Sequence, residues 1–362
     1  MRKKTVESLL CSIVFSLSLS LLFVFSSVAG QWTNPKEAIG DPNIARLQHG
    51  KKELTDMEKE EIKKYGFTGL ELMTYLDANN DPGEDNQYRF RRYVLTQSGN
   101  IIIFEAVNMR KYYYKNYRAL ITHDAIKPGD IQDKLRGFAM APPDRKRSGI
   151  VLHTFLRENI DDVVETGWRY DSSDRRASRR LTVDRSDSIG GSQITQDDWR
   201  WREPWEEDHK ILGDDTINGH QCFVVASTHR DPKYYLSKRI TWIEKHNFID
   251  PHEEQFDKES KLYKIIDKEW KQIEPSSYWV KVKQDYYNIL TEGRTLEETF
   301  QWIFNQHPSE DLFNPENMKT EIFWGEIKQV PRTIRLASDL PPKPESRAEF
   351  LKKLELKTKS GE

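Results

Sequence analysis

The segment Tyr278-Trp279-Val280-Lys281-Val282-Lys283-Gln284-Asp285-Tyr286 alternates apolar and polar side chains along most of its length. A period of two is typical of a β-strand that buries one face and leaves the other in water. The pattern therefore predicts a strand with Tyr278, Val280, Val282 and Tyr286 on the buried face and Lys281, Lys283 and Asp285 on the wet face.

The same alternation recurs in residues 298–304, where Phe300, Trp302 and Phe304 fall on one side. Residues 97–100, Gln-Ser-Gly-Asn, have the composition of a hairpin connection between two segments rich in β-formers. No helical pattern of comparable strength interrupts this region, which indicates a mainly β (α+β) chain with a large antiparallel sheet, curved or closed over its apolar face. The other predicted strands are residues 88–96, 101–107, 118–122, 150–156, 221–228, 239–244 and 262–270.

The first residues have the pattern of an export signal. Arg2, Lys3 and Lys4 precede an apolar run over residues 9–28, and small residues follow up to Ala29. This order predicts a signal peptide, residues 1–29, that is cleaved after export. An uncleaved membrane anchor is the alternative, because the run approaches the roughly 20 residues that span a bilayer.

The segments at either end of the predicted sheet have a different character. Residues 30–85 form a polar lead in which residues 68–76 predict a short helix docked on the main domain. Residues 77–85 superficially resemble a calcium loop, but Pro82 at its sixth position and Tyr88 at its twelfth favour a solvated turn. Residues 326–362 are expected to be a proline-rich linker and a tail, either loose or ending in a short docked helix.

Composition excludes several function classes. Lys plus Arg number 56 and Asp plus Glu 58, so no strong positive field favours nucleic acid. After cleavage only Cys222 of the two cysteines would remain, so stability must come from a packed core and not from an internal disulfide. The aromatic content of 11% suits both sheet cores and ligand cavities.

The motifs of common enzyme classes are missing from the sequence. It has no Gly-x-Ser-x-Gly elbow, zinc-binding His-Glu-x-x-His helix, Walker loop or dinucleotide fingerprint. His246 and His252 are separated by Pro251 and do not have the spacing of a helical ligand pair. We therefore expect no enzymatic activity, no cofactor and no metal.

Two clusters remain as candidate contact sites. Arg175, Arg176, Arg179 and Arg180 could bind lipid headgroups or an acidic partner, because guanidinium groups bind phosphates and carboxylates with two hydrogen bonds. A solvated surface with ordinary ion pairs explains them equally well. The tryptophans at positions 199, 201 and 205 either edge an apolar opening or cover the sheet.

Several segments, taken in order, resemble a known family. Gly167-Trp168-Arg169-Tyr170, the paired arginines of residues 175–180, and Gly191-Ser192-Gln193-Ile194-Thr195-Gln196-Asp197-Asp198 are similar to the W-x-Y, paired-arginine and G-S-D-F-x-x-x-D run of the LolA-like outer-membrane lipoprotein-sorting family. Later segments, such as residues 218–225 and 311–318, resemble the following strands and the last part of that family. Gln193-Ile194 departs from the usual Asp-Phe.

The resemblance implies a strongly curved antiparallel half-barrel with lidding helices over an apolar cavity, here residues 86–325. It also implies a periplasmic carrier of lipid or lipoprotein acyl chains, expected to be a monomer, that works with an inner-membrane exporter. A scaffold subunit of an envelope transport complex that carries nothing is the alternative. The residues expected in or near the cavity are Trp168, Tyr170, Tyr278, Val280, Val282, Tyr286, Phe300 and Trp302.

Overall fold

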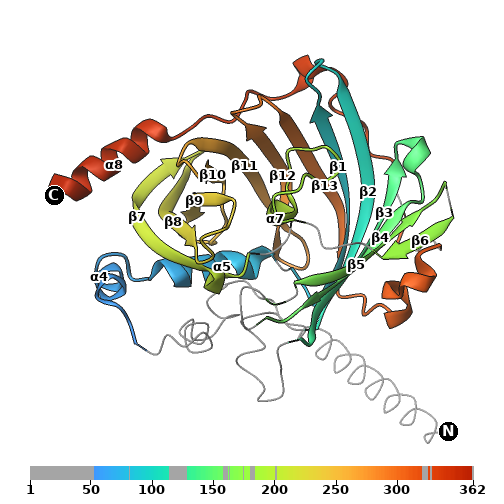
Figure 1. Cartoon of the computed structure of the whole chain (residues 1–362), viewed down its shortest axis with the longest axis horizontal. Helices are drawn as coiled ribbons and strands as arrows, with labels where there is room; N and C mark the ends of the chain where they lie inside the picture. The colour runs from blue at the N-terminus through green and yellow to red at the C-terminus, as the bar shows by residue number, and fades with distance from the viewer. Residues whose placement is uncertain are drawn as a thin grey trace, which may run out of the picture.

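A computed structural model describes residues 53–80, 82–113, 129–157, 162, 164–173, 175–179, 184–199, 202–319, 325–326 and 328–360. In these residues, 13 strands form one antiparallel sheet that curves strongly around a concave inner face (Figure 1). The leader and the predicted strand at residues 118–122 lie outside the described residues. The mainly β, half-barrel architecture expected from the sequence is confirmed.

The strands are long and follow one another closely. The first six are β1 (Asp85–Leu95), β2 (Ile101–Tyr112), β3 (Ile131–Ala141), β4 (Gly149–Phe155), β5 (Glu165–Asp171) and β6 (Arg176–Arg179). The others are β7 (Glu207–Ile217), β8 (His220–His229), β9 (Leu236–Glu244), β10 (His252–Asp257), β11 (Leu262–Ile273), β12 (Tyr278–Asn288) and β13 (Arg294–Phe304).

The first and last strands meet in the middle of the sheet. Strands β1 to β6 form one meander and β7 to β13 form another, and β1 pairs with β13 to join them. The hairpin expected at residues 97–100 connects β1 to β2. Every other neighbouring pair of the described strands is also consecutive in sequence, so within this sheet the β1–β13 seam is the one pairing between distant parts of the chain.

Two β-bulges change which side chains face inward. On β12, Lys283 lies opposite Glu269 and Lys281 opposite Trp270, so β12 has one extra residue at Val282. On β13, Phe300 and Ile303 lie opposite residues two apart on β1, and Gln301 has a φ of 54°. An extra residue shifts the alternation by one and moves the following side chains to the other face.

Helices cover one end of the inner face. Helix α4 (Asp56–Tyr65) begins at a capping box in which the Thr55 hydroxyl accepts a hydrogen bond from the Glu58 amide at 3.2 Å. Helix α5 (Gly69–Asn80) follows and packs against the inner face of β7 to β9. A Cβ on Gly69 would lie 2.9 Å from the Cβ of His209, so glycine permits this close approach. The buried cluster beneath α5 comprises Leu72, Met73, Tyr75, Leu76, Ile211, Phe223, Val225, Ile243 and Phe248.

Helix α5 continues through Asn80, so the first half of the segment expected to be a turn at residues 77–85 is helical. Asp85 lies at the start of β1, where its carboxylate accepts hydrogen bonds from the backbone amides of Gln306 and His307 at 2.6 and 2.8 Å. None of the helices in the described ranges has both the length and the hydropathy required to cross a bilayer.

The C-terminal segment is docked on the outer face. We call residues 328–354 the C-terminal strap. The Arg91 guanidinium donates hydrogen bonds to the carbonyl oxygens of Val330 and Pro331 at 2.8 and 3.0 Å. Further along, Arg347 forms an ion pair with Asp215, with 2.7 Å between Nη2 and Oδ2.

Helix α8 (Ala348–Ser360) follows Arg347 and begins against the sheet. Its Leu351 packs into a buried outer cluster with Trp242. The helix then projects toward the C-terminus (Figure 1). The tail was expected either to be loose or to end in a short docked helix, and the first part of α8 is docked.

Candidate functional site

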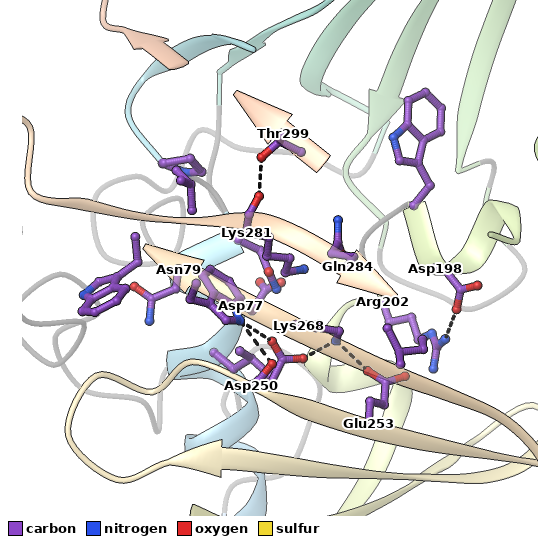
Figure 2. A pocket seen from close by; sticks show the side chains of 18 of the residues that line it. Asp77, Asn79, Asp198, Arg202, Asp250, Glu253, Lys268, Lys281, Gln284 and Thr299 are labelled. Atoms are coloured by element: carbon purple, nitrogen blue, oxygen red, sulfur yellow. Dashed lines mark hydrogen bonds and ion pairs between the residues drawn. The ribbon is translucent and has the colours of Figure 1, made fainter. Parts of the chain in front are cut away.

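A cavity of about 170 Å³ lies between the concave face of the sheet and the segments that cover it (Figure 2). Its wall is built from β1, β2 and β9 to β13, and its cover from α5 and the short helix α7 (Gln196–Trp199). The strands on both sides of the β1–β13 seam contribute side chains to the wall, because the sheet curves around the cavity.

Aromatic rings make up a large part of the lining. Tyr88 and Trp302 face each other across the seam with ring centroids 4.3 Å apart and planes inclined by 20°. The Trp302 Nε1 donates a hydrogen bond to the Thr299 hydroxyl at 3.1 Å, which fixes the ring orientation. The other aromatic residues at the cavity are Tyr112, Trp199, Trp270, Trp279 and Tyr286.

Charged side chains share this lining, which differs from the expected apolar cavity. Lys268 on β11 forms ion pairs with Asp250 and Glu253, the latter at 3.1 Å. Burial raises the pKa of Glu253, but the cations Lys268 and Arg239 outweigh burial and hold that pKa well below its usual value. Trp270 donates a hydrogen bond from Nε1 to Asp250 Oδ1 at 3.1 Å and links the aromatic lining to this cluster.

A second buried cluster fixes α7 to the sheet. Asp198 accepts from Lys264 Nζ at 2.6 Å and from Gln255 Nε2 at 2.8 Å, while Arg202 Nε lies 2.6 Å from Asp197. Burial raises the pKa of Asp198, and the opposing charges of Lys264 and Arg202 lower it below its usual value. Both aspartates of α7 are therefore paired with cations from elsewhere in the chain, Asp197 with Arg202 and Asp198 with Lys264.

Lys281 is the exception among the cations of the wall. Its side chain is half-buried, lines the cavity, and has its Nζ 5.2 Å from the centre of the Trp270 ring. Within the described ranges, no carboxylate forms an ion pair with it. Burial and the charge of Lys268 lower the pKa of Lys281 to about 8, against the opposing effects of Asp250, Glu253 and Asp77.

The structure places the predicted lining residues in two groups. Val280, Tyr286 and Trp302 lie at the cavity. Tyr278 instead packs edge-on against Phe304, with ring centroids 5.1 Å apart, and Val282 is the bulged residue of β12.

Three other predicted residues also lie away from the cavity. Phe300 is on the outer face, where Arg89 and Arg91 lie over its ring at 5.0 and 5.3 Å. Trp168 and Tyr170 on β5 belong to a separate buried cluster with Val151 and Met318. The bulges explain the errors on β12 and β13, and those on β5 arise because that strand lies near the far edge of the sheet.

The arginine cluster is on a sheet edge and not at the cavity. Arg175, Arg176 and Arg179 are exposed on or beside β6, the last strand at one end of the sheet. Arg180 lies outside the described residues. Trp199 does edge the cavity, Trp201 is also outside the described residues, and Trp205 lies beneath the Arg157 guanidinium at 5.6 Å.

Sequence reasoning missed the charged residues of the cavity wall. Asp250, Glu253 and Lys268 were assigned to no site, because charged residues in strands usually face water. Lys281 was expected on the wet face of its strand, and the bulge at Val282 brings it to the cavity instead. One signal was available, since Ile266, Lys268 and Trp270 alternate on β11 and mix a charge into an otherwise apolar face. Where the structure is described, no group of three or more His, Cys, Asp or Glu side chains is arranged to hold a metal ion.

Comparison with solved structures identifies the fold. A DUF1329 family protein from Desulfovibrio piger superposes with a TM-score of 0.59 at 15% identity, over 73% of this chain and 100% of that one. A putative outer membrane lipoprotein-sorting protein domain from Vibrio parahaemolyticus gives 0.57 at 19% identity, over 70% of this chain and 98% of that one. A LolA superfamily protein from Nitrosomonas europaea gives 0.50 at 12% identity, over 69% and 99%. The chain has a LolA-like fold.

Comparison with protein-family models matches only part of the chain. A family model described as an uncharacterized protein matches residues 142–320, which includes β4 to β13 of the LolA-like fold. No curated protein matches the chain. Because the solved relatives share less than a fifth of their residues with this chain, they establish its fold, and the LolA-like cavity must be interpreted from its own side chains.

Proposed function

We propose that this protein is a periplasmic carrier that binds the acyl part of a lipid or lipoprotein, working with an inner-membrane exporter, and that it is not an enzyme. The observation that supports the proposal is the cavity lined by the sheet, α5 and α7. Two solved structures with this fold are described as a lipoprotein-sorting domain and a LolA superfamily protein. The export signal predicted at residues 1–29 agrees with a periplasmic location.

Carriage requires only reversible burial. Each methylene moved from water into an apolar site contributes about 0.8 kcal/mol, so a few methylenes against the rings of Trp270, Trp279 and Trp302 hold a ligand without a covalent bond. A cavity of about 170 Å³ is smaller than the roughly 300–1,000 Å³ of most small-molecule sites. We therefore expect it to take one end of an amphiphile, and α5 or α7 to move when a longer chain enters.

The scaffold alternative predicts a well-packed interior. The cavity between Gln284, Thr299 and the covering helix α5 favours the carrier over that alternative.

The direct test is native mass spectrometry of the full chain purified from an exporting cell, together with titration of a fluorescent fatty acid. A carrier retains co-purified lipid and binds the fatty acid with saturation. The variant Gln284→Trp fills the cavity and should abolish binding, whereas Lys283→Trp, on the opposite face of the same strand, should not. If no lipid co-purifies and no fatty acid binds to the wild-type protein, the carrier proposal is wrong.

A further inference from the structure

Lys281 differs from the other cations among the described residues that line the cavity. Four neighbours have carboxylate partners: Lys268 with Asp250 and Glu253, Arg202 with Asp197, Arg239 with Glu207, and Arg110 with Asp133. The Lys281 ammonium instead has only a cation–π contact with Trp270 within the described part of the chain.

The two carboxylates with the largest electrostatic effect on Lys281 already have a partner. Asp250 and Glu253 are paired with Lys268, and Asp77 on α5 contributes only a smaller electrostatic effect. An ammonium in such a site is costly unless an anion neutralises it and completes its hydrogen bonds.

Apolar surface lies directly beside this charge. The Trp270 ring is 5.2 Å from Nζ, and Trp279 lies two residues before Lys281 on the same strand and lines the same cavity. A ligand with an anionic group on an apolar chain would satisfy both features, since its oxyanion would pair with the ammonium while its first methylenes lie on the rings.

We propose that Lys281 binds the carboxylate or phosphate group of such an anionic amphiphile, and that Trp270 and Trp279 contact the adjoining methylenes. This inference rests on the proposed carrier function and specifies which end of the ligand occupies the cavity. In this pair the ligand oxyanion replaces water on the Lys281 ammonium and accepts a charge-assisted hydrogen bond, which is stronger than a hydrogen bond between neutral groups.

Calorimetric titration with palmitate, hexadecyl phosphate, hexadecanol and inorganic phosphate tests the inference. We expect at least one of the two anionic amphiphiles to bind the wild-type chain about tenfold or more tightly than hexadecanol, which has the same chain length without the charge. Lys281→Gln should remove this preference and keep hexadecanol binding, which also shows that the variant is folded. Lys281→Arg should keep the preference, and so should Lys283→Gln, the matched control on the outer face.

The outcomes separate the two proposals. If hexadecanol and the anionic amphiphiles bind equally to wild type, the role of Lys281 is wrong and the carrier function stands. If none of the four compounds binds, both are wrong. If inorganic phosphate binds as tightly as hexadecyl phosphate, the site recognises a free anion and the amphiphile inference is overturned. A preference for palmitate over hexadecyl phosphate identifies a carboxylate as the head group, and the reverse identifies a phosphate.

Discussion

Lys264 on β11 and Asp198 on α7 form an ion pair with 2.6 Å between Nζ and Oδ2, and neither side chain has more than 1% of its surface exposed. The pair fixes α7, one of the two covering segments, to strand β11 of the sheet. An ion pair removed from water resists disruption because loss of one partner leaves an uncompensated charge in the interior.

Lys264→Met should therefore lower the free energy of unfolding by about 3–5 kcal/mol, measured by urea denaturation. The matched control is Lys261→Met, because Lys261 and Glu259 form a pair of the same 2.6 Å length that is largely exposed. That control should change stability by less than about 1 kcal/mol. Equal effects of the two substitutions would contradict a structural role for the buried pair.

In the absence of ligand, the charged Lys281 side chain should lower the free energy of unfolding. Its pKa of about 8 in the folded chain lies below its ordinary value of 10.5, so the unfolded state binds the proton more tightly. Lys281→Met should raise the free energy of unfolding by about 1–3 kcal/mol at pH 7. Wild-type stability should rise toward that of the variant between pH 8 and 10.5, and thermal melts over that range measure the difference. A variant less stable than wild type at pH 7 would show that Lys281 is paired in solution.

Stability at mildly acidic pH should depend on His209. Its Nδ1 lies 2.8 Å from the Ser227 hydroxyl and its Nε2 is 2.7 Å from the Pro204 carbonyl, and burial lowers its pKa to about 4. The folded state excludes a proton that the unfolded state accepts, so the neutral ring's contribution is complete above pH 6.5 and is lost as the pH falls to 4.

Between pH 6.5 and pH 4, the free energy of unfolding should fall by about 3 kcal/mol because of His209. His209→Asn should flatten the pH dependence of unfolding there, although it lowers stability at pH 7 by removing buried hydrogen bonds. His246→Asn, at an exposed position, should leave the wild-type profile unchanged. An unchanged pH profile for the His209 variant would disprove this assignment.

The C-terminal strap should contribute to global stability. Leu351→Ala removes a side chain that is 8% exposed from the cluster around Trp242 and should cost about 2–3 kcal/mol in urea denaturation. Leu336→Ala is the control, because Leu336 belongs to the same strap and is 65% exposed. A negligible effect at Leu351 would mean that helix α8 is undocked in solution.

The predictions from sequence succeeded where a pattern depends on local alternation. The period of two over residues 278–286 correctly predicted a strand, which is β12 (Tyr278–Asn288) in the structure, and the composition of residues 97–100 correctly predicted the hairpin. The side of the sheet was harder to assign, because one extra residue at Val282 or near Gln301 reverses it and no residue type marks a bulge in advance. Phe300 was for this reason expected inside and lies outside.

The polar part of the cavity could not be predicted for a different reason. Glu253, Lys268 and Lys281 come from separate strands. Their tertiary arrangement decides that Lys268 is paired with Glu253 while Lys281 has no carboxylate partner in the described part of the chain. The strap was equally hidden, since proline-rich segments such as residues 340–344 usually form linkers. Its docking depends on donors like Arg91 that lie some 240 residues earlier in the chain.

The seam between β1 and β13 has a consequence for folding. Each meander can assemble from neighbouring hairpins, but Arg92 and Glu297, which meet across the seam, are separated by 205 residues. Closing so long a loop is slow, so both meanders should form before they join. Until then each carries a long unpaired edge, β1 on one and β13 on the other, of the kind that recruits foreign strands. A nascent or nicked chain is therefore most prone to aggregate along the line that becomes the centre of the finished sheet.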